Sequence, residues 1–433
     1  MLPVTLAAAA AVATASSLSL SGIRDVLSTA ISNHVTPGLV AGIRDAFGNV
    51  IFLEAFGSLT YGEDTPLGQP NSFVTLDTFY DMASISKLIG PVSSAAYLYQ
   101  LGYMPDLDEL VSSNNYLGSF NYSQNGKETI TLRNLLLHNS GYPPDPSPSY
   151  ASVEFGCPAT SNPSPPLTLS CQDLIFTNLM AQTLENPTGA KMVYSDLSMI
   201  TLLYIVGRVV TREGLVTNAD FDLKRLPECI NASSSNPGGL FFACSYHAYW
   251  RKAIQPRLFA NGVNAVTNYV LDHSLWPLAS PTYVDEVYRN RIMQGDVSDA
   301  NSYALGGLAG HAGIFSTIRE CLDFTSVWQY GNSLLNSTTI SLWTRVWNST
   351  FSSRALGWVT QASTDTYFGC GNMSDSTFYH TGYTGTLVCV DPIRNLSTVL
   401  LTTRVYPNES NVPQIQALRQ AFNNEVIKAF DRY

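Results

Sequence analysis

The sequence has little charge, and positive charge is the scarcer kind. Only 13% of its 433 residues are charged, with 23 Lys and Arg against 33 Asp and Glu, giving a net charge of -10 at pH 7. Nucleic-acid binding needs clustered Lys and Arg, and the chain has no basic run. Hydrophobic residues make up 45% of the chain, enough to bury a substantial core. The composition predicts a compact globular protein and argues against a nucleic-acid partner.

Long apolar runs are also scarce. None reaches the roughly 18 uninterrupted residues that a membrane span needs, so we predict no transmembrane segment. Residues 1–15 are Ala-rich and end in Ala13-Thr14-Ala15, a small-residue pattern typical of signal-peptide cleavage, although no Lys or Arg precedes the run. We predict a signal peptide over 1–15 and a secreted or endomembrane-lumen protein. The alternative is a frayed apolar N-terminus.

The seven cysteines include no C-x-x-C pair and have no histidine at ligand spacing, which argues against a zinc site. Six of them fall into three local pairs around loops or paired strands, and closing a loop of about 15 residues is worth about 3 kcal/mol. The alternative is a cytosolic protein with seven reduced cysteines. We predict disulfides Cys157–Cys171, Cys229–Cys244 and Cys370–Cys389, with Cys321 a buried free thiol.

Asn-x-Ser/Thr sequons occur about as often as chance predicts for this Asn, Ser and Thr content. They are compatible with a secreted glycoprotein without establishing it. The sequon asparagines are Asn121, Asn231, Asn336, Asn348, Asn372, Asn395 and Asn408.

Both ends of the chain predict strands and helices of one sheet. In the N-terminal part, helical periodicity and alternation of apolar and polar residues predict a helix over 18–33, strands over 39–44 and 50–55, and a helix over 84–98. In the C-terminal part, the same patterns predict a helix ending near residue 330, strands over 366–369, 377–380, 385–390 and 396–402, and a helix over 413–430. The stretch between them is rich in helical patterns and polar loops, including a proline-rich loop over 142–170.

These patterns predict an α/β (α+β) fold. An antiparallel sheet built from both termini is flanked by helices and carries an inserted, mostly α-helical subdomain. We expect one catalytic unit over 18–430. It consists of an α/β part, 18–100 plus 307–430, and an inserted helical part, 101–306.

Residues 81–87 (Asp-Met-Ala-Ser-Ile-Ser-Lys) place a serine three residues before a lysine at the start of the helix expected over 84–98. That spacing puts the Ser84 hydroxyl and the Lys87 amine on one helix face. A neutral amine there can take the serine proton, which supplies a nucleophile with its own base. Serine is common in this chain, so one Ser-x-x-Lys is weak evidence.

Two other polar clusters interrupt apolar patterns. Residues 194–196 (Tyr-Ser-Asp) open a helix predicted over 194–208, where Ser195 or Asp196 would ordinarily serve as an N-cap. Residues 380–385 (His-Thr-Gly-Tyr-Thr-Gly) lie between strands, where glycines ordinarily indicate a turn or bulge. Each cluster alone is unremarkable.

In this order, the three clusters resemble the serine β-lactamase-related superfamily, which includes class C β-lactamases, penicillin-binding proteins, D,D-peptidases and esterases. Its members carry Ser-x-x-Lys, then Tyr-x-Asn, then Lys-Thr-Gly or His-Thr-Gly. Residues 132–141, 310–317 and 400–407 also resemble family segments. The resemblance extends over about residues 20–430.

The resemblance implies that Ser84 is the nucleophile, with Lys87 as its general base and Tyr194 assisting. It implies backbone N–H groups of Ser84 and Tyr383 as the oxyanion hole. Thr381 and Gly382 belong to the same substrate-facing edge, where Gly382 lets an acyl group approach closely. Nearby histidines, His138 and His311 among them, are expected to be structural.

Two residues depart from the family pattern. Asp196 stands where β-lactamases have Asn and, when ionised, offers no amide donor to a substrate carbonyl. His380 replaces the usual Lys and carries a charge only when protonated, so recognition of a substrate carboxylate would be weaker or pH-dependent. These changes put the substrate, rather than catalysis, in doubt.

We therefore predict a secreted serine hydrolase that acts on an ester or small amide through a Ser84 acyl-enzyme. It needs no metal and no cofactor, and its partner is a small-molecule substrate. The alternative is a catalytically silent scaffold or binding protein of the same fold, because mitochondrial relatives assemble into filaments.

Overall fold

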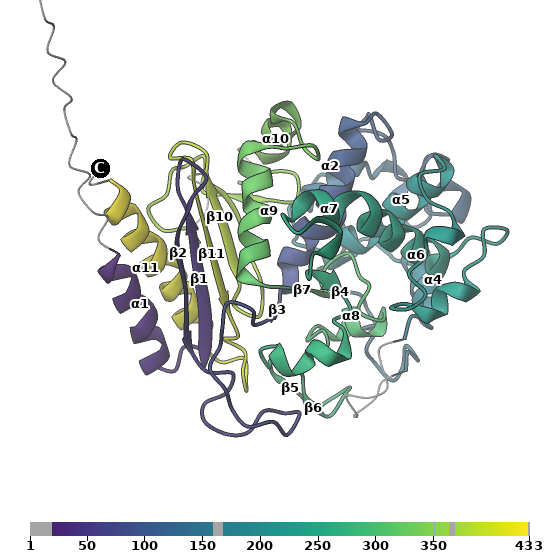
Figure 1. Ribbon diagram of the computed structural model, residues 1–433. Helices are drawn as coiled ribbons and strands as arrows, with labels where there is room; N and C mark the ends of the chain where they lie inside the picture. The colour runs from purple at the N-terminus through teal and green to yellow at the C-terminus, as the bar shows by residue number, and fades with distance from the viewer. Residues whose placement is uncertain (1–19, 159–167, 350, 363–368, 432–433) are drawn as a thin grey trace, which may run out of the picture.

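A six-stranded antiparallel sheet organises the structure, a computed structural model that describes residues 20–158, 168–349, 351–362 and 369–431. The strand order is β2-β1-β11-β10-β9-β8, so strands from both ends of the chain lie side by side (Figure 1). The predicted sheet is confirmed. The strands are β1 Gly38–Arg44, β2 Val50–Gly57, β8 Val359–Thr360, β9 Phe378–Thr381, β10 Leu387–Asp391 and β11 Leu396–Thr402.

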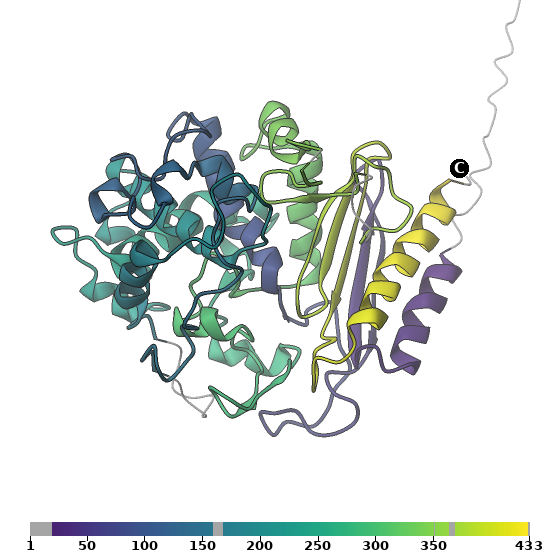
Figure 2. The same cartoon turned by 180° about the vertical axis from the view of Figure 1, so that it is seen from behind.

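The sheet is covered on both faces (Figures 1 and 2). Helices α1 (Ser21–Ser32) and α11 (Val412–Phe430) pack on one face, where Ile23 and Leu27 of α1 join the same apolar cluster as Phe422 of α11. Helix α9 (Ile318–Tyr330) covers the other face. An i, i+4 apolar spacing gives α1 a single buried face, which is why the periodicity was sufficient to predict this helix.

Beyond α9 lies a mostly helical region (Figure 2). Within the described part of 101–306, short strands β4, β5 and β6 accompany the helices, and β4 joins a small sheet of order β3-β7-β4. The remaining α-helices and strands are α2 Ser93–Gln100, α3 Leu132–Leu136, α4 Gln172–Ala181, α5 Asp196–Arg212, α6 Gly239–Tyr249, α7 Gln255–Leu258, α8 Ala300–Ala304, α10 Ser337–Thr344, β3 Tyr80–Asp81, β4 Asn268–Tyr269, β5 Val284–Asp285, β6 Arg291–Ile292 and β7 Ile314–Ser316.

The helix predicted over 84–98 is broken into three pieces. A 3₁₀ turn, Ala83–Ile85, is followed by a π-helical turn, Leu88–Val92, and then by α2. Pro91 lacks the N–H that a regular helix needs, and Gly90 has a non-helical ψ of -106°. A side chain on Gly90 would overlap the Tyr269 hydroxyl, so this close approach also requires glycine.

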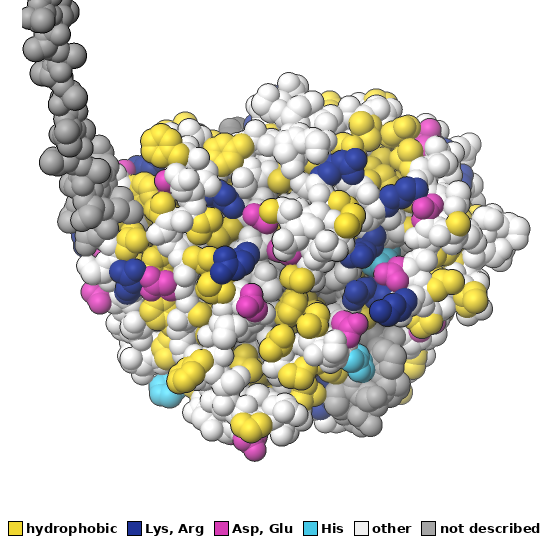
Figure 3. Space-filling view, viewed as in Figure 1, with side chains coloured by type: hydrophobic (Ala, Val, Ile, Leu, Met, Phe, Trp, Pro, Cys, Tyr) yellow, Lys and Arg dark blue, Asp and Glu magenta, His cyan; other side chains and the backbone are white. Residues whose placement is uncertain are grey.

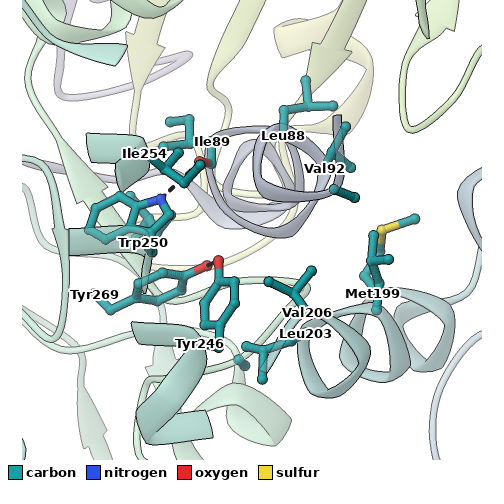
Figure 4. Packing of buried hydrophobic residues seen from close by; sticks show 14 of the residues in the cluster. Leu88, Ile89, Val92, Met199, Leu203, Val206, Tyr246, Trp250, Ile254 and Tyr269 are labelled. Carbon is teal, nitrogen blue, oxygen red and sulfur yellow. Dashed lines mark hydrogen bonds between the residues drawn. The ribbon is translucent and has the colours of Figure 1, made fainter. Parts of the chain in front are cut away.

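The broken helix is anchored in the helical core (Figure 4). Trp250 Nε1 donates a hydrogen bond of 3.1 Å to the Ile89 carbonyl, and the Tyr246 and Tyr269 hydroxyls lie 2.7 Å apart beside it. Leu88 and Val92 belong to the same buried apolar cluster as Met199 of α5, and Val92 lies on the side of the helix nearer to Met199. The segment that carries Ser84 and Lys87 is therefore held by fully buried contacts on its C-terminal side.

Two predictions fall wholly or largely outside the described residues: the signal peptide over 1–15, and the strand over 366–369, of which only Gly369 is described. None of the helices in the described ranges is long and apolar enough to cross a membrane. Figure 3 shows Lys and Arg interspersed with Asp and Glu on the face it presents. This mixture of charges agrees with a sequence that has no basic run.

The three predicted disulfides are present in the structure, between Cys157 and Cys171, Cys229 and Cys244, and Cys370 and Cys389. Cys321 is buried and free, with its sulfur 3.3 Å from the Ser316 hydroxyl oxygen.

Alkylation in denaturant without reductant is expected to modify one cysteine, because only Cys321 carries a free thiol. After reduction, seven cysteines are expected to react. Peptide mapping of the alkylated protein by mass spectrometry provides the measurement. Modification of all seven without reductant would overturn both the disulfides and the oxidising compartment that they indicate.

Candidate active site

Ser84 lies on a sharp turn just after β3. The preceding residue, Ala83, has a positive φ of 45°, a conformation that costs a non-glycine residue about 1 kcal/mol. The buried Asp81 carboxylate holds this turn by accepting the Ala83 N–H at 2.8 Å and both the N–H and hydroxyl of Ser298 at 2.7 Å. Burial raises the pKa of Asp81 even though these hydrogen bonds favour its charged form. Sequence reasoning did not assign Asp81 this positioning role.

Lys87 is the best-connected side chain of the site. Its Nζ donates hydrogen bonds to Ser84 Oγ at 2.9 Å and to the His311 carbonyl at 3.1 Å. It also lies 2.8 Å from Asp196 Oδ1, while only 1% of the Lys87 side chain is exposed. The predicted Ser–Lys contact is therefore formed by a 3₁₀ turn rather than by a regular helix.

The charge state expected for Lys87 is wrong. The sequence led us to expect a neutral amine, because burial lowers the pKa of lysine. Burial does act in that direction, but the Asp196 carboxylate, followed by Tyr194, raises the pKa above its ordinary 10.5. Before substrate binds, Lys87 is therefore an ammonium. The main cause of its raised pKa is the carboxylate at position 196, where the family pattern has Asn.

Tyr194 lies beside this pair, between two cations. The Lys87 ammonium is 4.8 Å from the centre of its ring, and the Arg354 guanidinium is 5.1 Å away on the basic side of the site. His138 packs against the same ring at 4.6 Å and accepts the Ser195 N–H at 3.0 Å through Nδ1. Burial lowers the pKa of His138 well below its usual value, so this histidine is neutral and structural.

The start of α5 positions Tyr194 and Asp196 without conventional capping. Ser195 occupies the N-cap position but makes no side-chain cap hydrogen bond, donating instead to the Pro143 carbonyl at 2.6 Å. The Asp196 N–H donates to the Pro144 carbonyl at 2.8 Å. The start of the proline-rich loop thus fixes the beginning of α5 and leaves the Asp196 carboxylate free to pair with Lys87.

The turn after β9 is docked on the turn that carries Ser84. The Thr384 hydroxyl donates to the Asp81 carbonyl at 2.8 Å, and the Thr386 hydroxyl donates to the Met82 carbonyl at 3.3 Å. A Cβ on Gly382 would overlap the Thr386 hydroxyl and lie 2.7 Å from the Met82 carbonyl oxygen. Only glycine allows residue 382 to pack this closely against Met82, two residues before Ser84. Tyr383 is 52% exposed and lines both cavities that Ser84 lines.

Gly382→Ala is expected to reduce covalent modification of Ser84 by an acyl probe by a factor on the order of 100, because the edge carrying the Tyr383 N–H must move away from Ser84. Rates of probe labelling, with circular dichroism to verify folding, test this. Ser28→Ala, on the exposed side of α1 and far from this turn, is the control and should be labelled like wild type. Equal labelling of Gly382→Ala and wild type would remove the turn from the site.

His380 cannot supply the positive charge that Lys supplies in many family members. Burial, followed by the nearby Arg354 and Lys87 charges, lowers the pKa of His380 well below its usual value. Its Nδ1 lies 2.8 Å from the Thr381 carbonyl oxygen. The imidazole is therefore neutral at pH 7, and positive charge near it comes from arginines that sequence reasoning did not assign.

Two cavities share Ser84, Tyr194 and Tyr383 in their walls. The first, of about 390 Å³, is lined by carboxylates, and the second, of about 370 Å³, is lined by arginines. Ser84 thus stands between an acidic and a basic compartment. The titratable lining residues, apart from the tyrosines, are Asp145, Asp196, Asp299, Glu409 and His311 in the first cavity, and Arg354, Arg404, Arg419 and the neutral His380 in the second.

His311, expected to be structural, lines the acidic cavity. Its Nε2 lies 2.9 Å from Asp299, and Asp299 also caps α8 by accepting the Ser302 N–H at 2.6 Å. Burial lowers the pKa of His311, but Asp196 and Asp299 raise it above its usual value. Burial opposes ionisation of Asp299, yet His311 holds the pKa of that carboxyl at about 2. Nothing in the local sequence indicated this pair.

Asp196, Asp299 and His311 offer donor atoms within 4.8 Å of one another, which is close enough to hold a metal ion. Two features oppose a cation there. The Lys87 ammonium already pairs with Asp196, and the His311 ring nitrogen already lies 2.9 Å from Asp299. This group is better described as an ion-pair network around Lys87.

The beta-lactamase family model matches residues 23–214 and 258–422. The chain belongs to the beta-lactamase family. A protein of Salmonella agona (strain SL483) named "Putative D-alanyl-D-alanine carboxypeptidase" is 25% identical over 378 residues, covering 84% of this chain and 78% of the relative. The protein of Salmonella typhi with the same name matches with the same identity and coverage.

Solved structures share the fold at low sequence identity. Simvastatin synthase (LovD) from Aspergillus terreus superposes with a TM-score of 0.64 at 16% identity, covering 96% of this chain and 99% of that one. A class C beta-lactamase from Rhodobacter sphaeroides gives 0.60 at 17%, covering 94% and 99%. EstCE1, a hydrolase with promiscuous acyltransferase activity, gives 0.60 at 18%, covering 92% and 98%. The predicted family and fold are confirmed.

Proposed function

We propose that this protein is a secreted serine hydrolase that cleaves an ester or small amide through an acyl-enzyme on Ser84. The observation that carries the proposal is the 2.9 Å hydrogen bond from Lys87 Nζ to Ser84 Oγ, beside two cavities that both reach Ser84. A nucleophile, a proton-transfer partner and space for substrate on both sides are the minimum that acyl transfer requires.

The proton of Ser84 needs an acceptor, and the free-site Lys87 is already protonated. Substrate bound over Ser84 excludes water, and a dry environment favours neutral groups over ions. Transfer of one proton across the 2.8 Å contact from Lys87 to Asp196 leaves a neutral amine and a neutral acid. The amine then takes the Ser84 proton as Oγ attacks the acyl carbon, and Tyr194 borders the same path.

The developing oxyanion needs two converging donors. The backbone N–H groups of Ser84 and Tyr383 are our candidates, because the Gly382 turn is docked against Met82 and Ala83. The leaving group then departs with a proton returned by Lys87. A water molecule then attacks the acyl-enzyme by the same proton-transfer steps, which releases the carboxylic acid and restores the Ser84 hydroxyl.

The names of the relatives agree with this reaction class: a carboxypeptidase, a beta-lactamase, a hydrolase with acyltransferase activity and a synthase. The scaffold alternative is weaker because Ser84, Lys87 and Tyr194 are all retained and are in contact. Secretion is supported by the three disulfides, which persist in oxidising compartments.

Intact mass spectrometry after incubation with a fluorophosphonate, and separately with a penicillin, tests the proposal. We expect one adduct per chain with the fluorophosphonate, located on the peptide that carries Ser84. Turnover of p-nitrophenyl acetate should accompany it. No adduct with either probe between about pH 6 and 9 would leave the scaffold as the better description.

A further inference from the structure

The acidic cavity contains carboxylates on several sides and no lysine or arginine in its lining. Asp145 follows the start of the proline-rich loop, Asp299 caps α8, and Glu409 lies in the segment between β11 and α11. Asp196 forms the wall nearest Lys87. These carboxylates are separated in sequence and are brought together only around Ser84.

The positive charges facing this cavity do not cancel the carboxylates. Lys87 is occupied by Asp196, and His311 is occupied by Asp299. Arg404 lines the other cavity, with its guanidinium 4.6 Å from the centre of the exposed Tyr383 ring, and it donates to the backbone carbonyl of Glu409 at 3.0 Å rather than to the Glu409 carboxylate. Among the described residues, neither the Asp145 nor the Glu409 carboxylate forms a salt bridge with a lysine or an arginine, so these two carboxylates remain in excess. Repulsion from Asp196 and Asp299 adds to burial in raising the pKa of Asp145.

Two observations independent of the acids indicate that a ligand belongs in this cavity. Ser84, the hydrogen-bonded partner of Lys87, opens into it. His311, whose side chain is 1% exposed, also lines it, and the Nδ1 of that ring has no hydrogen-bond partner among the described residues. A buried polar atom without a partner is costly, and a ligand acceptor or water beside the ammonium group would satisfy it.

We propose that this cavity binds a positively charged amine of the substrate, so that the preferred acyl donors are aminoacyl esters or amides with a free amino group. The inference rests on the proposed acyl-enzyme function and adds its substrate class. Ser84 Oγ bonds to the aminoacyl carbon and the alcohol or amine leaves with the serine proton. Water then cleaves the new ester and yields the free amino acid.

The size and polarity of the site suit such a substrate. A cavity of about 390 Å³ accommodates a small aminoacyl group with its ammonium between Asp145, Asp299 and Glu409. The arginine-lined cavity on the other side of Ser84 receives the rest of the substrate. An N-acetylated donor has lost its charge, and leaves the carboxylates without a counter-ion.

Alanine p-nitroanilide and N-acetyl-alanine p-nitroanilide, each as the D and L isomers, provide a matched test at pH 7 with the full chain. An α-amine has a pKa near 7.7–8.0, so the free form is mostly charged there. We expect kcat/KM for the better free-amine isomer to exceed that of its acetylated form by about tenfold or more. The preference should fall as the pH is raised through 9.

The double variant Asp145→Asn/Glu409→Gln is expected to lower the free-to-acetylated ratio at least about fivefold, because it removes two of the carboxylates while preserving size. Asp25→Asn on the exposed side of α1 makes the same kind of charge change far from Ser84 and should leave the ratio unchanged. The ratio is the readout, because a general loss of activity or folding would lower both terms together.

The remaining outcomes are decisive. If a fluorophosphonate labels Ser84 and p-nitrophenyl acetate is hydrolysed, but the free amine gives no advantage, the amine subsite is wrong and the hydrolase stands. If EDTA abolishes the preference and added Zn²⁺ restores it, the acidic cluster holds a metal, and the amine proposal is overturned. If no probe or substrate acylates Ser84, both proposals fail.

Discussion

Replacing Ser84 by alanine is expected to eliminate the fluorophosphonate adduct and to lower ester turnover by about 10³-fold or more. Ser84 Oγ is the only candidate nucleophile that both contacts Lys87 and lines the two cavities in the described structure. Intact mass spectrometry measures the adduct, and p-nitrophenyl acetate hydrolysis measures turnover. Any hydrolysis by the Ser84→Ala variant above the background rate would have to proceed without a covalent intermediate on Ser84.

The substitution should leave the fold intact. Ser84 is partly exposed, and the turn beneath it is held by Asp81 and the 382–386 segment rather than by the serine hydroxyl. Ser28→Ala on the exposed face of α1 is the matched control and should label like wild type. An adduct that persists on Ser84→Ala would place the nucleophile elsewhere.

Lys87→Ala and Asp196→Asn are expected to slow acylation at pH 7 in two distinguishable ways. Without Lys87 there is no base in contact with Ser84 Oγ, so acylation should fall about 10²- to 10⁴-fold at every pH. With Asn at position 196, the amine remains but loses its proton acceptor. Acylation should then be at least tenfold slower at pH 7 and recover as pH rises, by up to about tenfold per unit.

The recovery follows from the pKa of Lys87. Asp196 is the largest contributor that raises this pKa, and burial opposes it. Removing the carboxylate therefore lowers the pKa of Lys87, and alkaline solution deprotonates the amine directly. Rates of fluorophosphonate labelling between pH 6 and 10 separate the two variants. If the Asp196→Asn variant is acylated at the wild-type rate at pH 7, proton transfer from Lys87 to Asp196 is not part of the mechanism.

The same pair contributes to stability. The folded-state pKa of Lys87 is raised above 10.5, so its contribution is fully present below pH 10.5 and is lost as pH rises through the folded-state value. At pH 7 Lys87→Ala should therefore reduce the free energy of unfolding by a few kcal/mol, on the order of 3, because Asp196 is left largely buried without its partner. Urea unfolding with and without Lys87 measures this.

Local patterns in the sequence were sufficient for most of the fold. Apolar spacing in α1 and α11 and alternation in β1, β10 and β11 predicted elements that the structure contains within a few residues. The prediction of a continuous helix over 84–98 was wrong in detail, since Pro91 breaks the ladder and Gly90 must avoid Tyr269. That second constraint comes from a residue about 180 positions away.

By itself the sequence determined the family, the sheet built from both termini, the three cysteine pairs and the candidate residues Ser84, Lys87 and Tyr194, because periodicity, spacing and motif order are local properties. Only the tertiary structure decided the charge on Lys87, the neutrality of His380 and the division of charge around Ser84. Those properties depend on burial and on distances to Asp196, Asp299 and Arg354. No local pattern encodes distances between side chains that meet only after folding.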